Sequence, residues 1–236
     1  MKVLAIDTST HVMGVALGQD EDLLGEYITN FKKNHSLRLM PSIDQLLQEL
    51  NVKPHELDAI AVAKGPGSYT GVRIGVTTAK SLAWALNIPV YGISSLHMLA
   101  RNGKHFNGCI CPFMDARRGQ VYTGLYKWEN GFIKEIEKDR IILLEDWLEM
   151  LKEKQVPLLF LSQDLNKHKE SIDHKLGVQA VYGDSTEGIP KPSELLDIAW
   201  NQEESISAHA LVPEYTQLTE AEKNWHAANE GKKTDE

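Results

Sequence analysis

The sequence predicts an α/β protein of two similar lobes, and two observations lead to this prediction. Residues 57–86 combine a buried apolar strand, a glycine-rich turn and the start of a helix, which is a repeating unit of α/β folds. The same order of elements, three strands followed by helix, strand, helix and strand, occurs in each half of the chain. The 236 residues are enough for two lobes of about 100 residues each.

The first half opens with three short strands and continues with two helices. Apolar segments at 3–6, 12–17 and 23–28 are joined by clusters of Asp, Thr, Ser and Gly, which predicts an antiparallel meander. His35 and Ser36 then open the first helix, with Ser36 as its N-cap, and apolar side chains recur along this helix at helical spacing.

The second helix, at 72–86, precedes a strand at 89–93 and is apolar nearly all round. Such a helix is buried on several sides. Its own sheet covers one side, so another helix, from this chain or from a second one, must cover the other. The residues that recur every four positions along one face are all small, namely Gly71, Gly75, Ala79 and Ala83, and they would let that helix approach closely.

The turn at 64–71 is also a candidate anion site. Glycines permit positive φ and close approach of the backbone to a ligand, and the following helix N-terminus offers free N–H groups. The turn serves equally well as a tight β-to-α connection, because it lacks the Gly-Lys-Ser/Thr ending of a phosphate loop and the glycine pattern of dinucleotide sites. The candidate cofactor-binding residues are Asp7, Gly65, Gly67, Ser68 and Thr70.

Asn-Gly pairs at 102–103 and 107–108 predict a boundary between the lobes. We expect an N-terminal lobe at 1–104, completed by a helix at 193–202, and a C-terminal lobe at 105–192. The polar residues 219–236 are expected to form a disordered tail. The second half is predicted to hold strands at 109–114, 120–126, 132–136, 157–161 and 178–182 and helices at 145–154 and 165–176.

Composition limits the possible functions. The net charge of -8 argues against a chain that binds nucleic acid by itself, because phosphates require a positive field. Cys109 and Cys111 are expected to be free buried thiols. Two residues apart on an extended strand, they lie too far from each other in space for disulfide geometry, and two cysteines are too few ligands for a metal site. The apolar start of the chain is too short for a signal peptide and no stretch approaches the ~20 apolar residues of a membrane helix, so we expect a cytoplasmic protein.

Four segments, taken in order, resemble the TsaB family, formerly YeaZ. They are Asp-Thr-Ser at 7–9, His-Ser at 35–36, the glycine-rich segment 65–75 and the segment 115–122. The resemblance covers the first half of the chain well and the second half only by the order of its elements. The family is a subunit of the bacterial machinery that makes threonylcarbamoyladenosine in tRNA.

The resemblance implies an actin-like ATPase-domain fold, related to ribonuclease H, with two similar lobes that each have a mixed sheet and flanking helices. It also implies a non-catalytic sibling of TsaD, the subunit that moves the threonylcarbamoyl group from its adenylate to an adenosine of tRNA by means of a metal on a His-x-x-x-His pair. The chain would be a scaffold and activating subunit of the complex that modifies tRNAs reading codons that begin with A.

The chain departs from the catalytic pattern in two places. His97 has no second histidine one turn away, where Ile93 and Arg101 stand, and one imidazole cannot hold a catalytic ion. Ser9 stands where active actin-like ATPases carry a phosphate-wrapping glycine, and Asp7 either orients a metal-bound water or caps its own turn. We therefore expect no catalytic residue, no metal site and no tightly bound cofactor in this chain, with ATP and a metal held by other subunits.

The resemblance further implies that the first two helices dock on the equivalent helices of a TsaD-like subunit. For any single residue, ordinary packing in the core of the lobe explains equally well the apolar positions of the first helix and the small residues of the second helix. A TsaE-like ATPase is the other expected partner, tRNA is expected to bind only through the complex, and the isolated chain is expected to form a homodimer through the same patch. On this hypothesis Gly75→Leu or Ala79→Trp leaves the monomer folded and abolishes docking. The predicted interface residues are His35, Leu39, Ile43, Leu46, Gly71, Arg73, Gly75, Val76, Ala79 and Ala83.

Two points stay open at this stage. Arg117 and Arg118, adjacent at a predicted hairpin turn, suit contact with tRNA phosphates or a partner's carboxylate, but also a solvated hairpin tip. The alternative functions are a stand-alone actin-fold ATPase, small-molecule kinase or peptidase-like hydrolase, and an interaction module outside tRNA modification. The sequence shows no general base that could activate Ser68 as a nucleophile, which argues against a peptidase.

Overall fold

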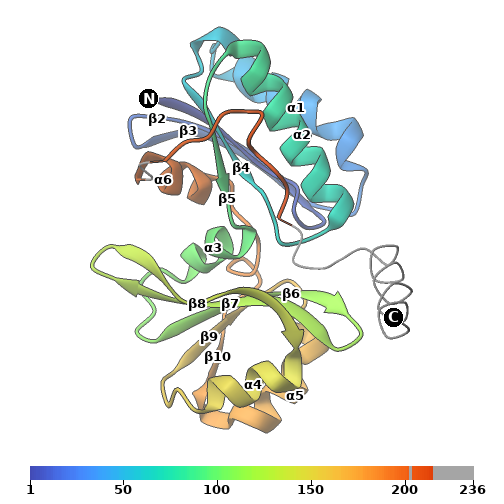
Figure 1. Cartoon of the computed structure of the whole chain (residues 1–236), viewed down its shortest axis with the longest axis vertical. Helices are drawn as coiled ribbons and strands as arrows, with labels where there is room; N and C mark the ends of the chain where they lie inside the picture. Colours follow the sequence, from blue (N-terminus) through green and yellow to red (C-terminus); the bar gives the residue numbers. More distant parts are fainter. Residues whose placement is uncertain (202–203, 215–236) are drawn as a thin grey trace, which may run out of the picture.

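The computed structural model describes residues 1–201 and 204–214, so the expected tail at 219–236 lies outside the described residues. Two lobes stack along the long axis of the molecule, each with one five-stranded sheet (Figure 1). The boundary predicted after residue 104 falls between a short 3-10 turn, η2 (Arg101–Gly103), and the first strand of the second sheet. Within the described ranges no helix is both long and apolar enough to cross a membrane.

The N-terminal sheet has the strand order β3-β2-β1-β4-β5. Its first three strands are antiparallel, and β4 and β5 join β1 in parallel. This is the ribonuclease H-like topology, and its near repetition in the second lobe gives the actin-like fold that the family resemblance implies. The strands are β1 (Lys2–Asp7), β2 (Val12–Gln19), β3 (Asp22–Asn30), β4 (Ala59–Ala63) and β5 (Val90–Ile93).

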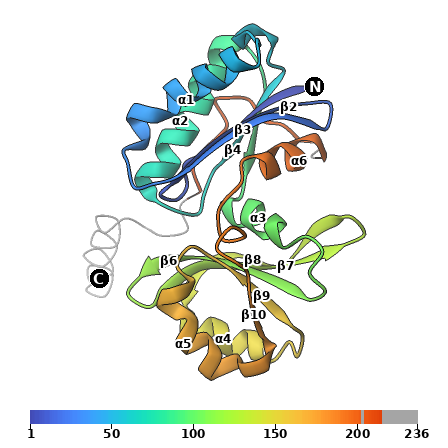
Figure 2. The ribbon, with the colours of Figure 1, turned by 180° about the vertical axis from the view of Figure 1, so that it is seen from behind.

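Helices cover both faces of this sheet. The α1 (His35–Glu49) and α2 (Tyr69–Leu86) helices lie side by side on one face and α6 (Ser193–Asn201) lies on the other, as Figures 1 and 2 show from opposite sides. Because successive strand residues point to opposite faces, Leu4 packs with the α1–α2 layer while Val3 packs with α6. Double cover explains why β1, β2 and β4 are buried almost throughout.

The start of α1 differs from the prediction. Its N-cap is Asn34, whose side-chain oxygen accepts a hydrogen bond from the Ser36 backbone N–H at 3.1 Å, and Ser36 already lies inside the helix. Asn and Ser are comparable N-caps, so residue preference alone did not separate these two neighbouring positions.

The glycine-rich turn closes tightly onto the turn between β1 and β2. A Cβ on Gly67 would lie 2.2 Å from the Ser9 carbonyl oxygen, and a Cβ on Gly71 would lie 2.1 Å from the Thr8 carbonyl oxygen. Hydrogen bonds hold this contact: the Ser68 N–H donates to the Ser9 carbonyl at 2.7 Å, and the Thr8 hydroxyl donates to the Gly71 carbonyl at 2.7 Å. The glycines are therefore required for packing within the chain.

The small-residue stripe of α2 faces inward, which corrects the expectation that it is a free surface. Gly75 approaches the Thr8 side chain, where an added Cβ would lie 2.5 Å from the hydroxyl oxygen, and Ala79 is fully buried. The covering helix is the chain's own α1, which packs on α2. The residues of the predicted interface that lie in this core are Leu39, Ile43, Leu46, Gly71, Gly75, Val76, Ala79 and Ala83.

The C-terminal sheet has the order β10-β9-β6-β7-β8, with α4 (Leu144–Lys152) and α5 (Leu165–Leu176) on one face. The strand predicted at 132–136 is longer, because β8 is an exposed edge strand in which charged residues interrupt the apolar alternation. Cys109 and Cys111 are free and buried, as predicted. The strands are β6 (Cys109–Arg117), β7 (Gln120–Glu129), β8 (Phe132–Leu143), β9 (Leu158–Leu161) and β10 (Ala180–Tyr182).

A short helix absent from the predicted order, α3 (Ser95–Ala100), joins the lobes. Leu96 and Leu99 pack into a cluster with Ile110 of the second sheet. Behind α3, the nearly buried Arg101 forms ion pairs at 2.7 Å with both Glu194 and Asp197 of α6. The elements after residue 182 thus return to the first lobe and are fixed there by a hydrogen-bonded ion-pair network.

Packing of the α2 stripe generates a stability prediction. Ala79→Trp is expected to lower the free energy of unfolding by about 3 kcal/mol or more, because the indole must displace packed core atoms. Thr77→Trp, on the exposed side of the same helix, is the matched control and is expected to change it by less than about 0.5 kcal/mol. Urea unfolding checks both variants. A wild-type midpoint for Ala79→Trp would contradict the buried placement of the stripe.

Candidate functional site

Two pockets open between the lobes. The first, here named the loop cleft, has a volume of about 700 Å³ and lies between the β1–β2 turn, the glycine-rich turn and the β6–β7 hairpin. The second, here named the junction pocket, has a volume of about 1050 Å³ and lies between α3, the end of α6 and the β7–β8 hairpin. Both are in the size range of small-molecule sites.

Asp7, at the end of β1, is fully buried and is not among the residues that line the loop cleft, although the nearby Ser9 is. One carboxylate oxygen accepts the Ser9 backbone N–H at 2.8 Å, so Asp7 caps its own turn. Its other oxygen and the Ser9 hydroxyl have no hydrogen-bond partner in the described part of the chain. Burial raises the pKa of Asp7 above its ordinary value, and the hydrogen bond from the Ser9 backbone N–H opposes that shift.

The other predicted cofactor residues are only partly brought together. Gly67, Ser68 and Thr70 line the loop cleft, whereas Gly65 lies outside its lining, beside the Glu214 backbone. Ser68 is used within the chain, since its N–H donates to the Ser9 carbonyl and its side chain caps α2 by accepting the Gly71 N–H. The turn forms the connection from β4 to α2.

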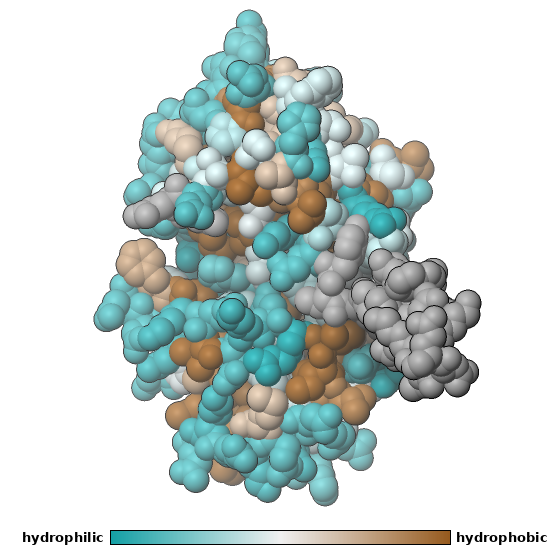
Figure 3. Space-filling view, viewed as in Figure 1, coloured by the Kyte–Doolittle hydropathy of each residue, from teal (hydrophilic) through white to brown (hydrophobic). Residues whose placement is uncertain are grey.

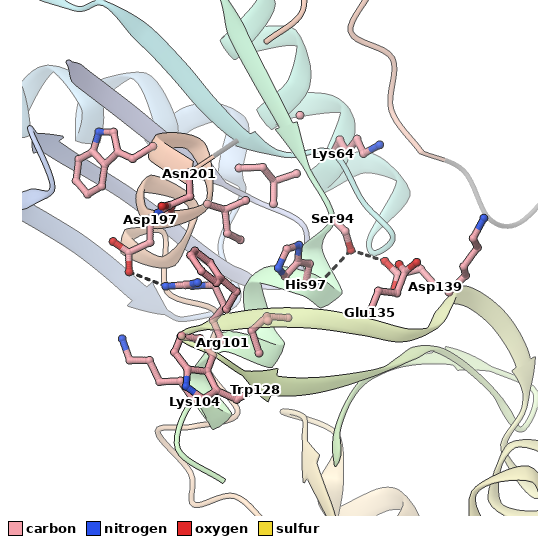
Figure 4. Close-up of a pocket in the computed structure, with 18 of the residues that line it drawn as sticks. Lys64, Ser94, His97, Arg101, Lys104, Trp128, Glu135, Asp139, Asp197 and Asn201 are labelled. Atoms are coloured by element: carbon pink, nitrogen blue, oxygen red, sulfur yellow. Dashed lines mark hydrogen bonds and ion pairs between the residues drawn. The ribbon is translucent and has the colours of Figure 1, made fainter. Parts of the chain in front are cut away.

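The junction pocket holds a polar cluster that the sequence did not reveal (Figure 4). Ser94 caps α3 by accepting the N–H groups of Leu96 and His97 and hydrogen-bonds to the Asp139 carboxylate. The Tyr126 hydroxyl donates to the other oxygen of the same carboxylate. Burial raises the pKa of Asp139 to about 6, although both hydrogen bonds act in the opposite direction. A carboxyl on β8 thus ties the C-terminal lobe to the linking helix.

His97 lies on α3 and lines the junction pocket. Its ring stacks on Tyr126 with 5.7 Å between ring centroids. Burial, assisted by the nearby Arg101 charge, lowers the pKa of His97 to about 4, so the imidazole is neutral at physiological pH. Nowhere in residues 1–201 and 204–214 do three or more His, Cys, Asp or Glu side chains come together in a way that could hold a metal ion.

Other residues of α1 and α2 are exposed instead of the predicted stripes. Leu37 is 73% exposed, Met40 46%, Tyr69 41% and Trp84 69%; these four residues define the α1–α2 face. Among the predicted interface residues, Arg73 is exposed beside this face and His35 is half-buried. Figure 3 shows apolar side chains among polar ones over the upper lobe, where the two helices lie. Their wide spacing along the helices hid this face from a periodicity analysis.

The junction cluster generates a pH prediction. Because the folded pKa of Asp139 exceeds its unfolded value, the stability that its protonated form contributes is complete below pH ~4 and is lost as the pH rises through about 6. Asp139→Asn stays neutral at every pH. We expect the wild type to lose about 2–3 kcal/mol of unfolding free energy relative to this variant between pH 4 and 7. Urea unfolding of both proteins across this range checks it, and a pH-independent difference would contradict the assignment.

Comparison with known proteins agrees with this fold. Residues 22–225 match the family model "TsaD: tRNA N6-adenosine threonylcarbamoyltransferase". The chain is 51% identical over 95% of its length to the tRNA threonylcarbamoyladenosine biosynthesis protein TsaB of Bacillus subtilis, of which 98% is covered. It is 32% identical to the TsaB protein of Escherichia coli over 61% of this chain and 62% of that one.

A solved structure, YeaZ from Pseudomonas aeruginosa, superposes on this chain with a TM-score of 0.76. The superposition covers 91% of this chain and 99% of the other at 27% sequence identity. Sequence and fold therefore agree over nearly the whole length, and the chain belongs to the TsaB family of tRNA threonylcarbamoyladenosine biosynthesis proteins.

Proposed function

We propose that this chain is the non-catalytic scaffold and activating subunit of a complex that forms threonylcarbamoyladenosine in tRNAs reading codons that begin with A. It docks on a TsaD-like catalytic subunit through the α1–α2 face. The observation that carries this proposal is family membership, combined with a glycine-rich turn that packs on the chain's own β1–β2 turn.

The geometry of the loop cleft supports a non-catalytic role. Gly67 and Gly71 pack on the Ser9 and Thr8 carbonyls, so the backbone positions that an active ATPase keeps open for phosphates are filled by protein. His97 is a half-buried neutral side chain stacked on Tyr126 and has no second histidine on its helix. ATP and a metal ion would then be held by the other subunits, a TsaE-like ATPase and the catalytic subunit.

The α1–α2 face supports docking through large exposed apolar side chains. Both helices already bury one side against their own sheet, so the exposed Leu37, Met40 and Trp84 have no role in that core. Trp and Tyr contribute most often to binding energy at protein interfaces, and this face carries one of each. The isolated chain would cover the same face by forming a homodimer.

Two substitutions on this face test docking. Leu37→Asp combined with Trp84→Asp is expected to weaken binding to the catalytic subunit at least about 30-fold, because two apolar contacts are replaced by charges that must be desolvated. Both side chains are exposed, so the thermal midpoint should stay near that of the wild type. Val178→Asp, at a fully exposed apolar residue of the other lobe, is the matched control. Calorimetric titration with the catalytic subunit measures the affinity.

Reconstitution tests the role itself. The catalytic and ATPase subunits, tRNA, threonine, bicarbonate and ATP are incubated with and without this chain, and the modified nucleoside is quantified. We expect product only when the chain is present, and the double variant of the α1–α2 face should lower the yield in proportion to its lost docking. Turnover of ATP or modification of tRNA by this chain alone would refute the non-catalytic role, and wild-type docking by the double variant would refute the interface.

A further inference from the structure

The rim of the loop cleft carries an excess of positive charge on an acidic protein. Lys32 and Lys33 on the β3–α1 loop and Arg117 at the end of β6 line the cleft from opposite lobes, and all three are exposed. Within residues 1–201 and 204–214 none of the three forms an ion pair with a carboxylate, although the whole chain has a net charge of -8.

The two carboxylates that line the cleft do not neutralise these cations. Lys167 lies 2.9 Å from an Asp115 oxygen and 2.7 Å from an Asp164 oxygen, so both carboxylates are already paired. Asp115 also accepts the Arg117 backbone N–H at 3.0 Å, a bond that involves the backbone of the hairpin and not the guanidinium. Among residues 1–201 and 204–214, the carboxylates that line the cleft leave these three cations available to an external anion.

Arg117 is also held in an unfavourable backbone conformation. It has φ +67°, followed by Arg118 at +53° and Gly119 at +74°. A left-handed conformation is uncommon for residues other than glycine, although tight hairpin turns require it. Glycine at position 117 would adopt this backbone without strain, so the hairpin itself does not require the arginine.

From these observations we propose that the rim of the loop cleft, formed by Lys32, Lys33 and Arg117, binds backbone phosphates of the RNA substrate. This inference rests on the proposed function, in which tRNA is bound by the assembled complex. The cations are exposed and stand on segments of opposite lobes, so an extended polyanion that lies across the mouth can contact all three. An RNA backbone fits this arrangement better than a buried nucleotide.

An aromatic side chain at the same mouth supports RNA. Tyr69, at the first position of α2, is 41% exposed and lines the cleft, with the Arg73 guanidinium 3.8 Å from its ring centroid. Unpaired bases stack on aromatic rings and on guanidinium planes in RNA-binding proteins. The end of β6 and the start of α2 lie on the same side of the molecule in both ribbon views, and Arg117 and Tyr69 line the same cleft (Figures 1 and 2). Phosphate and base contacts would therefore fall on one continuous surface.

The test neutralises the rim. Lys32→Gln, Lys33→Gln and Arg117→Gly are combined, and the assembled complex is titrated with an unmodified tRNA transcript at several salt concentrations. We expect about tenfold weaker binding at low salt and a slope of log affinity against log salt that is shallower by about 2–3, because each lost phosphate contact contributes about one. The matched control neutralises three exposed lysines outside the cleft, Lys134, Lys138 and Lys152, and is expected to leave both values unchanged.

A second variant separates charge from hairpin structure. Arg117→Lys keeps the cation and should bind tRNA within about twofold of the wild type. Arg117→Gly alone should show part of the loss while its thermal midpoint stays the same or rises, because glycine relieves the backbone strain. Loss of binding in the lysine variant, or equal losses in the rim and control triple variants, would overturn the proposal.

Assembly and nucleotide binding are scored separately. If the wild-type chain does not co-purify with the catalytic subunit, the proposed function fails and this inference fails with it. If the rim variant assembles normally and binds tRNA with unchanged affinity and salt slope, the inference alone fails. In a further experiment the isolated chain is titrated with ATP. If ATP binds saturably to the wild type and not to the rim variant, while the rim variant in the complex still binds tRNA normally, the phosphate site belongs to a nucleotide. That result would overturn the RNA proposal.

Discussion

Closure of the glycine-rich turn onto the β1–β2 turn is the contact on which the rest of this structure depends. Gly67 and Gly71 let the start of α2 approach the Ser9 and Thr8 carbonyls closely, and two hydrogen bonds of 2.7 Å hold the turns together. This contact fixes the position of α2 on the sheet and, through α2, that of α1. The same turn lines the loop cleft, so the atoms that organise the lobe also shape one wall of that pocket.

The features on which the proposed function depends lie on the surface of the molecule. The α1–α2 face presents large apolar side chains, while the mouth of the loop cleft presents cations from both lobes. These surfaces meet at the N-terminal end of α2, where Tyr69 belongs to both. A subunit that docks a sister protein and a polyanion on adjacent surfaces needs no catalytic group of its own.

The junction between the lobes is built differently from either core. Arg101 joins α6 through a nearly buried ion-pair network, and Asp139 joins the Ser94 cap of α3 to Tyr126. Buried polar contacts of this kind are directional, so they specify one relative placement of two lobes that apolar contacts alone would leave less defined. They also make the junction sensitive to protonation at Asp139.

The sequence by itself determined the two-lobed α/β architecture, the order of nearly all strands and helices, the free thiols and the family, because these follow from local periodicity and short motifs. It did not determine which side of α1 and α2 faces outward. A small-residue stripe predicts only that something approaches closely, and the tertiary structure supplies the chain's own Thr8 carbonyl and α1 in that role. Likewise, only folding brings Lys32, Lys33 and Arg117 from distant segments to one rim, since charge at a site depends on neighbours in space and not on neighbours in sequence.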